Sequence, residues 1–269
     1  MAGIRNQESV CVVASNNVNP KAKGFTLVEL SIVLVIIGLI VSGIVAGQSL
    51  VKQAKIRRIS TEADQYKAAV NTFYLEYNAV PGDFNRANSY WTGANSGDGD
   101  GKITGLTEGG YLWGHLVRAG LLNGGYTGVS IPTNEIPGVN TGLSAFSSSA
   151  GFHAFTFGVS NYWFYGTNAV YGKINVNVFG FGAVDSTVTT IQALSILNPQ
   201  QAAALDKKFD DGSPSKGMIL ADLGYSAAPA YNCTSMGHYA DSYVSGDNPV
   251  TYNLSSTSPQ CRMMFLWNK

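Results

Sequence analysis

Residues 24–30, with the sequence GFTLVEL, open an apolar run that continues to Val51. Between Lys23 and Lys52 this run contains a single charged residue, Glu29. An apolar stretch of this length is long enough to cross a bilayer as a helix. A lone carboxylate in hydrocarbon costs about 3 kcal/mol, so Glu29 needs a partner.

The flank before the apolar run is polar and mainly basic. Its charged residues are Arg5, Lys21 and Lys23 against Glu8. The positive-inside rule favours a cytoplasmic location for such a flank. A secretory signal peptide has its small cleavage-site residues after the apolar core, whereas here Gly24 precedes that core. Cleavage after Gly24 would therefore keep the apolar segment and free the amine of Phe25, about one helical turn before Glu29.

Residues 21–30, KAKGFTLVEL, resemble the class III signal of type IV pilins and type II secretion pseudopilins. In that family a prepilin peptidase cuts after the glycine and methylates the new N-terminal phenylalanine. The resemblance implies cleavage between Gly24 and Phe25 and N-methylation of Phe25. It also implies that Glu29 is the assembly glutamate, which would pair with the Phe25 amine of a neighbouring subunit. The alternative is a plain signal anchor in which the glutamate is accidental.

A single long helix is predicted from Phe25 to about Asn78, because this stretch contains no proline. Its first half is apolar all round, as in a membrane span or a bundle core. In its second half apolar residues recur every three or four positions, which predicts one face buried against a head. They are Ile56, Ile59, Ala63, Tyr66, Val70, Phe73 and Tyr77. Pro81 and Gly82 stop the helix.

The predicted organisation is a leader, a helix and a head. Residues 1–24 form the cleaved leader, residues 25–79 the helix, with 25–51 as its transmembrane or filament-core half, and residues 80–269 the head. The fold class is α+β, with an antiparallel sheet packed on the long helix. Strands are predicted at 153–165, 170–179, 218–221 and 261–267. Short helices are predicted at 110–122 and from Asn198, where an N-cap, a proline and a glutamine open a helix to 208.

Cysteine usage predicts a disulfide in the head. Cys11 lies in the leader, so processing would leave only Cys233 and Cys261. Two cysteines in an oxidising compartment usually pair, and closing a loop of about 29 residues would contribute roughly 3 kcal/mol. The resemblance agrees, because many type IV pilins close a C-terminal loop in this way. Metal ligation and two free thiols are the alternatives.

Residues 97–103, GDGDGKI, resemble the acidic half of a calcium loop, with alternating carboxylates, a glycine and then an apolar residue. Gly101 would take the sixth position of that loop. The candidate ligands are then Ser96, Asp98 and Asp100. The twelfth position falls on Thr107, with Glu108 one residue late, so the full EF-hand signature fails. A solvated aspartate and glycine turn is the alternative, and no cofactor is required by the sequence.

The sequence argues against an enzyme and against obligate nucleic-acid binding. The three histidines are scattered, and no nucleophile elbow or phosphate-binding glycine loop is present. Removing residues 1–24 takes away three basic residues and one acidic residue, so the formal net charge changes from zero to −2. A chain without a basic excess lacks the electrostatic footprint of a nucleic-acid-binding protein.

The sequence therefore predicts a structural subunit of a type IV pilus-like filament. It would begin as a single-pass precursor in a bacterial inner membrane and end in an extracellular or periplasmic filament. Its partners would be other pilin subunits, the prepilin peptidase, the assembly platform and, before assembly, the lipid bilayer. The alternatives are a pseudopilin or minor tip subunit of a type II secretion system, and a membrane-anchored adhesin that binds calcium or glycans. The aromatic run at 162–165 could stack on sugars.

Overall fold

The structure is a computed structural model that describes residues 24–129, 136–157, 176–183, 194–223, 232–235 and 250–267. The chain divides into two compact units, Met1–Ser49 and Leu50–Lys269. The second unit contains the head together with the second half of the long helix. The division therefore falls at the end of the apolar run rather than at the end of the helix.

Helix α1 (Leu27–Tyr77) has two halves with different surroundings. Among the described residues it is the one helix that is long and apolar enough to cross a membrane, and its large apolar side chains between Leu27 and Val51 are exposed in the single chain. In the second half, the predicted face is buried from Ile56 to Phe73, and Tyr77 is partly buried. The helix ends at Tyr77, and the next residue, Asn78, has a positive φ of 49°, the left-handed conformation common after helix ends.

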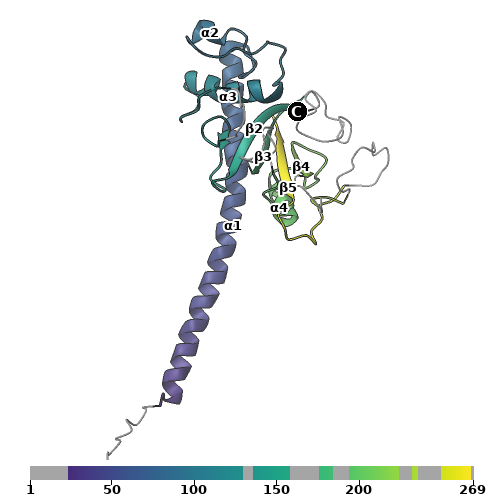
Figure 1. Cartoon of the computed structure of the whole chain (residues 1–269). Helices are drawn as coiled ribbons and strands as arrows, with labels where there is room; N and C mark the ends of the chain where they lie inside the picture. Colours follow the sequence, from purple (N-terminus) through teal and green to yellow (C-terminus); the bar gives the residue numbers. More distant parts are fainter. Residues whose placement is uncertain are drawn as a thin grey trace, which may run out of the picture. The chain divides into compact units, whose positions relative to one another are not determined.

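The head is built on a five-stranded antiparallel sheet (Figure 1). The strands are β1 (Gly142–Leu143), β2 (Ala150–Phe157), β3 (Val176–Ala183), β4 (Ile219–Leu223) and β5 (Cys261–Leu266). Their order is β1-β2-β3-β5-β4, so the C-terminal strand lies inside the sheet. The α+β fold class with an antiparallel sheet is confirmed.

The register of the sheet places large aromatic residues on the face that packs against α1. Phe152 pairs with Phe181 across β2 and β3, and Phe179 pairs with Phe265 across β3 and β5. Tyr66 of α1 contacts this face, with its ring centroid 5.2 Å from that of Phe152. Aromatic pairs of this kind contribute about 0.5–1.5 kcal/mol beyond the area they bury. This aromatic layer forms the main core of the head.

In the described part of the head, three short helices accompany the sheet: α2 (Ala87–Tyr90), α3 (Gly105–Arg118) and α4 (Pro199–Phe209). Helix α4 begins as predicted, because the Asn198 and Gln201 side chains each accept a hydrogen bond from the other's backbone N–H. Helix α3 starts five residues before its predicted start, because the Glu108 carboxylate accepts hydrogen bonds from the N–H and hydroxyl of Thr104. No helix was predicted for residues 87–90 or 105–109, which α2 and the first turn of α3 occupy.

The predicted strand bounds were correct only in part. Strand β2 starts at Ala150, three residues early, and β3 continues to Ala183, four residues past its predicted end. Glycines at 151, 180 and 182 hid these ends, because glycine is depleted in strands. The stretches 158–165 and 170–175 lie outside the described residues, as does the aromatic run at 162–165.

Candidate functional site

The start of α1 holds Glu29 in a reciprocal hydrogen-bond arrangement with Thr26. The Glu29 carboxylate accepts hydrogen bonds from the Thr26 N–H at 2.8 Å and from the Thr26 hydroxyl at 2.9 Å. In return the Thr26 Oγ1 accepts the Glu29 N–H at 3.2 Å. This is a capping box, which satisfies backbone donors that the first turn of a helix otherwise leaves unpaired.

The capping box changes the interpretation of Glu29. The resemblance implied a partner for Glu29 in a neighbouring subunit, but the carboxylate already has one in its own chain, Thr26. The signal was available in the sequence, because Thr26 and Glu29 have the spacing of a threonine and a glutamate in a capping box. Phe25, just before the box, has 87% of its surface exposed. Gly24 is also exposed.

The surface of the apolar half has gaps where another helix could approach. At Gly38, Gly43 and Gly47, apart from the neighbouring residues and the helix's own backbone, no described atom lies within 4 Å of the position that a Cβ would occupy. Stripes of small residues allow helix backbones to pack closely in a bilayer or a bundle. The first 25 residues of α1 therefore combine an apolar surface with positions of small volume.

Cys233 and Cys261 are joined by a disulfide, with 28 residues of sequence separation. Both residues are fully buried. Cys261 is the first residue of β5, and its backbone also exchanges hydrogen bonds with Leu197 at 2.8 and 3.1 Å. The disulfide therefore connects the segment around Cys233 to an anchored strand inside the sheet.

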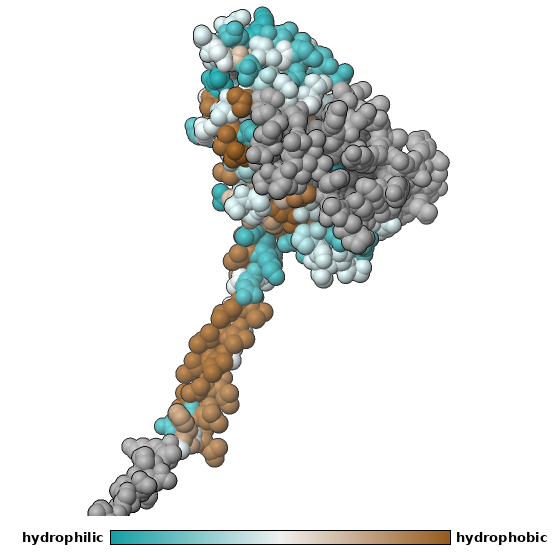
Figure 2. Space-filling view, viewed as in Figure 1, coloured by the Kyte–Doolittle hydropathy of each residue, from teal (hydrophilic) through white to brown (hydrophobic). Residues whose placement is uncertain are grey.

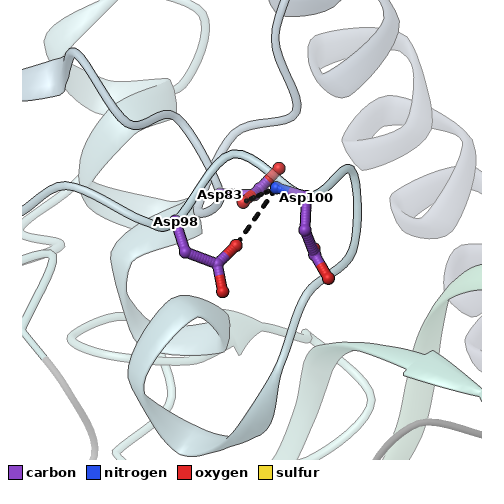
Figure 3. A group of neighbouring side chains, drawn as sticks. All are labelled: Asp83, Asp98 and Asp100. Atoms are coloured by element: carbon purple, nitrogen blue, oxygen red, sulfur yellow. Dashed lines mark hydrogen bonds between the residues drawn. The ribbon is translucent and has the colours of Figure 1, made fainter.

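The acidic loop after α1 is organised by a residue that the sequence reasoning missed, Asp83 (Figure 3). Asp83 is buried, and its carboxylate accepts three backbone hydrogen bonds, at 2.5 Å from Gly99, 3.1 Å from Asp100 and 2.7 Å from Gly101. Burial raises the pKa of Asp83 to about 6, although the hydrogen bonds from Gly101 and Gly99 act in the opposite direction. The loop thus wraps around a carboxylate.

The predicted calcium ligands are only partly brought together. Carboxylate oxygens of Asp83, Asp98 and Asp100 lie within 4.8 Å of one another. The third predicted ligand, Ser96, has another contact: its hydroxyl accepts a hydrogen bond from the Asn88 N–H at 3.3 Å. The donor set is chemically suitable for calcium, which prefers carboxylate oxygens. However, backbone N–H groups already occupy both oxygens of Asp83, and calcium binding stays a prediction.

Two glycines make the acidic loop possible. A Cβ at Gly97 would lie 2.4 Å from the Cα of Asp83, so only glycine fits there. Gly101, the expected turn glycine, has a positive φ of 84°, a conformation that glycine adopts without steric cost. The close approach at Gly97 and the left-handed backbone at Gly101 therefore account for these two glycines as structural residues.

A second acidic group ends α4 and also has structural partners. Asp206 is fully buried and accepts hydrogen bonds from Tyr252 at 2.7 Å and from Gly212 at 3.1 Å. Asp210 accepts backbone hydrogen bonds from Met218 and Ile219 at 2.5 and 2.7 Å. These bonds connect the end of α4 to the start of β4, so this cluster has a structural role.

Comparison with known proteins identifies the N-terminal segment. Residues 19–45 match the family model described as the prokaryotic N-terminal methylation motif. The match covers Lys21, Lys23, Gly24, Phe25, Glu29 and most of the apolar run. With the long apolar helix that follows, this motif makes the N-terminal segment similar to that of type IV pilins and pseudopilins.

Comparisons over the whole chain add less. No curated protein sequence matches the chain. A solved structure, that of the major type IV pilin PilA1 from Clostridium difficile, matches at 13% sequence identity and a TM-score of 0.32. That match covers 82% of this chain and 99% of the other. A TM-score this low does not establish a common head fold, so the similarity to pilins is limited to the N-terminal motif.

Proposed function

We propose that this protein is a structural subunit of a type IV pilus-like filament. The observation that supports this most strongly is the methylation motif followed directly by an apolar helix whose side chains are exposed in the single chain. Exposed apolar side chains over such a length need a bilayer or a bundle of like helices. A filament subunit uses both in turn, the bilayer before assembly and the bundle afterwards.

Processing would begin at Gly24. A prepilin peptidase would cut between Gly24 and Phe25 and methylate the Phe25 amine, and an inner-membrane platform would then assemble the subunits. In the filament, Glu29 would accept an ion pair from the Phe25 amine of a neighbouring subunit. Two opposite charges buried together cost far less than one alone, so this pair would fix the register between subunits.

The capping box supports a two-state role for Glu29. In the precursor, the Thr26 N–H and hydroxyl satisfy the carboxylate, which lowers the cost of holding it in the bilayer. In the filament, the amine of a neighbour would add a full positive charge. Structural subunits of this kind need no catalytic centre, and we propose that the protein is not an enzyme.

The test of this proposal is electron microscopy of shed surface material, with mass spectrometry of the filaments. Filaments composed of this chain are the expected result. Its presence only as a minor component at one filament end would favour a tip subunit, and short periplasmic filaments encoded beside secretion genes would favour a pseudopilin. Recovery only as a membrane-bound monomer that binds calcium or glycans would contradict the filament role.

A further inference from the structure

Basic residues are concentrated directly after the apolar run of α1. Lys52, Lys55, Arg57 and Arg58 lie within seven positions. All four are exposed, and no acidic residue occurs between Glu29 and Glu62. Along α1 the surface changes from hydrophobic brown to hydrophilic teal at this point (Figure 2).

These cations oppose the orientation that the proposed function requires. The flank before the apolar run has three basic residues, fewer than the flank after it. The positive-inside rule counts lysine and arginine near both ends of a span. Counted over both flanks, it does not favour an exported head. The orientation of the span in the membrane therefore does not explain the basic residues on its head side.

Part of this basic segment lines a groove in the head. The groove has a volume of about 590 Å³ and lies between residues 50–65 of α1 and Lys208 of α4. Its cations are Arg57, Arg58 and Lys208, and its one acidic lining residue is Glu62. At the end nearest the apolar run it is lined by Leu50.

Glu62 does not neutralise the groove. Its carboxylate accepts hydrogen bonds from the Arg58 Nε at 3.1 Å, the Ser144 hydroxyl at 2.6 Å and the Ala145 N–H at 3.1 Å, and its side chain is only 12% exposed. Within the described part of the chain, neither Arg57 nor Lys208 forms an ion pair. Among the residues that the structure describes, Arg57 and Lys208 therefore line the groove without an ion-pair partner.

The chemistry of the groove matches the phosphate of a lipid head group. Arginine presents a planar fork that binds phosphate in a bidentate manner, and lysine adds a mobile point charge. Each basic residue near an anionic membrane surface contributes about fivefold in affinity. Leu50, near the end of the apolar run, lines the groove, so we expect the groove to lie close to the lipid head groups.

We propose that Arg57 and Lys208 hold the phosphate of an anionic phospholipid in the leaflet that adjoins the head. This proposal rests on the membrane anchoring in the proposed function. It explains why cations occur on the head side of the span, and it gives the precursor a lipid contact that must be released when the subunit enters a filament.

The test uses the full chain in nanodiscs of phosphatidylcholine with one fifth phosphatidylglycerol. Native mass spectrometry after release from the nanodisc counts the lipids retained by each protein. We expect the parent chain to retain phosphatidylglycerol above its bulk fraction. The double variant Arg57→Gln/Lys208→Gln should lose this preference by at least about tenfold, since two cations are removed. Arg57→Lys, which keeps the charge, should lose less.

The matched control is Arg86→Gln/Lys102→Gln. It removes the same charge near α2 and before α3, far along the chain from the groove, and should leave the lipid preference unchanged. Equal loss in both double variants would show a general charge effect and overturn the proposal. So would full displacement of the lipid by millimolar glycerol phosphate, or a dimer in the parent that the groove variant loses while lipid retention stays the same.

The same test distinguishes a failure of the lipid-site proposal from a failure of the membrane anchoring on which it rests. A chain that fails to insert into nanodiscs of any composition would overturn the anchoring and the lipid site together. A chain that inserts but shows no preference for phosphatidylglycerol would overturn the lipid site alone.

Discussion

Glu29 has two possible partners, and single substitutions separate them. Thr26 holds it within the helix through two hydrogen bonds. The proposed filament pair needs its negative charge. A glutamine at this position keeps an oxygen that can accept the Thr26 N–H, but removes the charge. An alanine removes both interactions. The two variants therefore distinguish the cap from the ion pair.

We predict that Glu29→Gln and Glu29→Ala are both processed after Gly24 and both assemble poorly. Filament yield should fall by at least about tenfold in each, because a buried amine without a counter-charge is strongly destabilising. Immunoblots of sheared filaments and of whole cells measure assembly and processing separately. Thr26→Ala, which weakens only the cap, is the control. Normal filaments from Glu29→Gln would exclude the ion pair.

The buried His115 makes the stability of the head depend on pH, and acid is expected to lower that stability. Its Nδ1 accepts the Gly82 N–H at 2.9 Å, and its Nε2 lies 2.7 Å from the Asn95 carbonyl oxygen. Both contacts are satisfied by a neutral ring with the proton on Nε2. Burial, helped by the charge of Arg118 and opposed by the Asn95 contact, lowers the pKa of His115 to about 4.

We predict that the contribution of His115 to stability is lost as the pH falls from about 6.5 to about 4. The unfolded chain binds a proton in this range and the folded head does not, so acid favours unfolding. A shift of this size corresponds to up to about 3 kcal/mol. Denaturant unfolding of the parent and of His115→Gln at several pH values measures the difference. Parallel curves for the two proteins would contradict this account.

At the scale of elements, the acidic loop after α1 is either a structural turn or an ion site, and a substitution of Asp83 distinguishes the two. Asp83 accepts three backbone hydrogen bonds. We predict that Asp83→Ala lowers the free energy of unfolding by about 3 kcal/mol, because three N–H groups lose a charged acceptor. The loss should be the same in calcium and in a chelator, as measured by denaturant unfolding. A loss confined to calcium-containing buffer would identify the loop as an ion site.

The disulfide can be tested at the same scale. We predict no free thiol in the denatured mature protein and one in the uncleaved precursor, from Cys11. Replacing Cys233 and Cys261 together with serine should lower the free energy of unfolding by about 3 kcal/mol, since the crosslink restricts the unfolded chain. A thiol assay and denaturant unfolding measure the two effects. Two reactive thiols in the mature protein would contradict the pairing.

The sequence predicted elements well where the signal was local. The buried face of α1 followed from apolar residues three and four positions apart, and the start of α4 followed from Asn198, Pro199 and Gln201. The predicted start of α3 was wrong, because Gly109 and Gly110 obscured the helical pattern. The Glu108 side chain caps this helix from within its first turn by accepting the Thr104 N–H. Local rules identify an element more reliably than its ends.

The candidate site was predicted only in part, for a different reason. Asp98 and Asp100 were found from their spacing, but Asp83 is distant from them in sequence and becomes their neighbour only when the loop folds back. No local pattern marks such a pair. The cap at Thr26 follows from a local spacing, but the resemblance to pilins implied a partner for Glu29 in another subunit instead.

At the scale of the whole molecule, the two units have separate requirements. The head buries its own core against the second half of α1, as its aromatic layer shows. The apolar run of α1 has exposed side chains that the described part of the chain does not cover. A molecule with a stable head and an uncovered apolar helix suits insertion first into a membrane and then into a bundle.

The central claim is that processing leaves Phe25 as the N-terminus of a protein that keeps its apolar helix. Intact-mass and N-terminal peptide spectrometry of the protein isolated from filaments tests it most directly. The account predicts a chain that begins with N-methylated Phe25 and retains residues 25–51. An N-terminus at Met1, an N-terminus after the apolar run, or an unmodified end at another residue would contradict it.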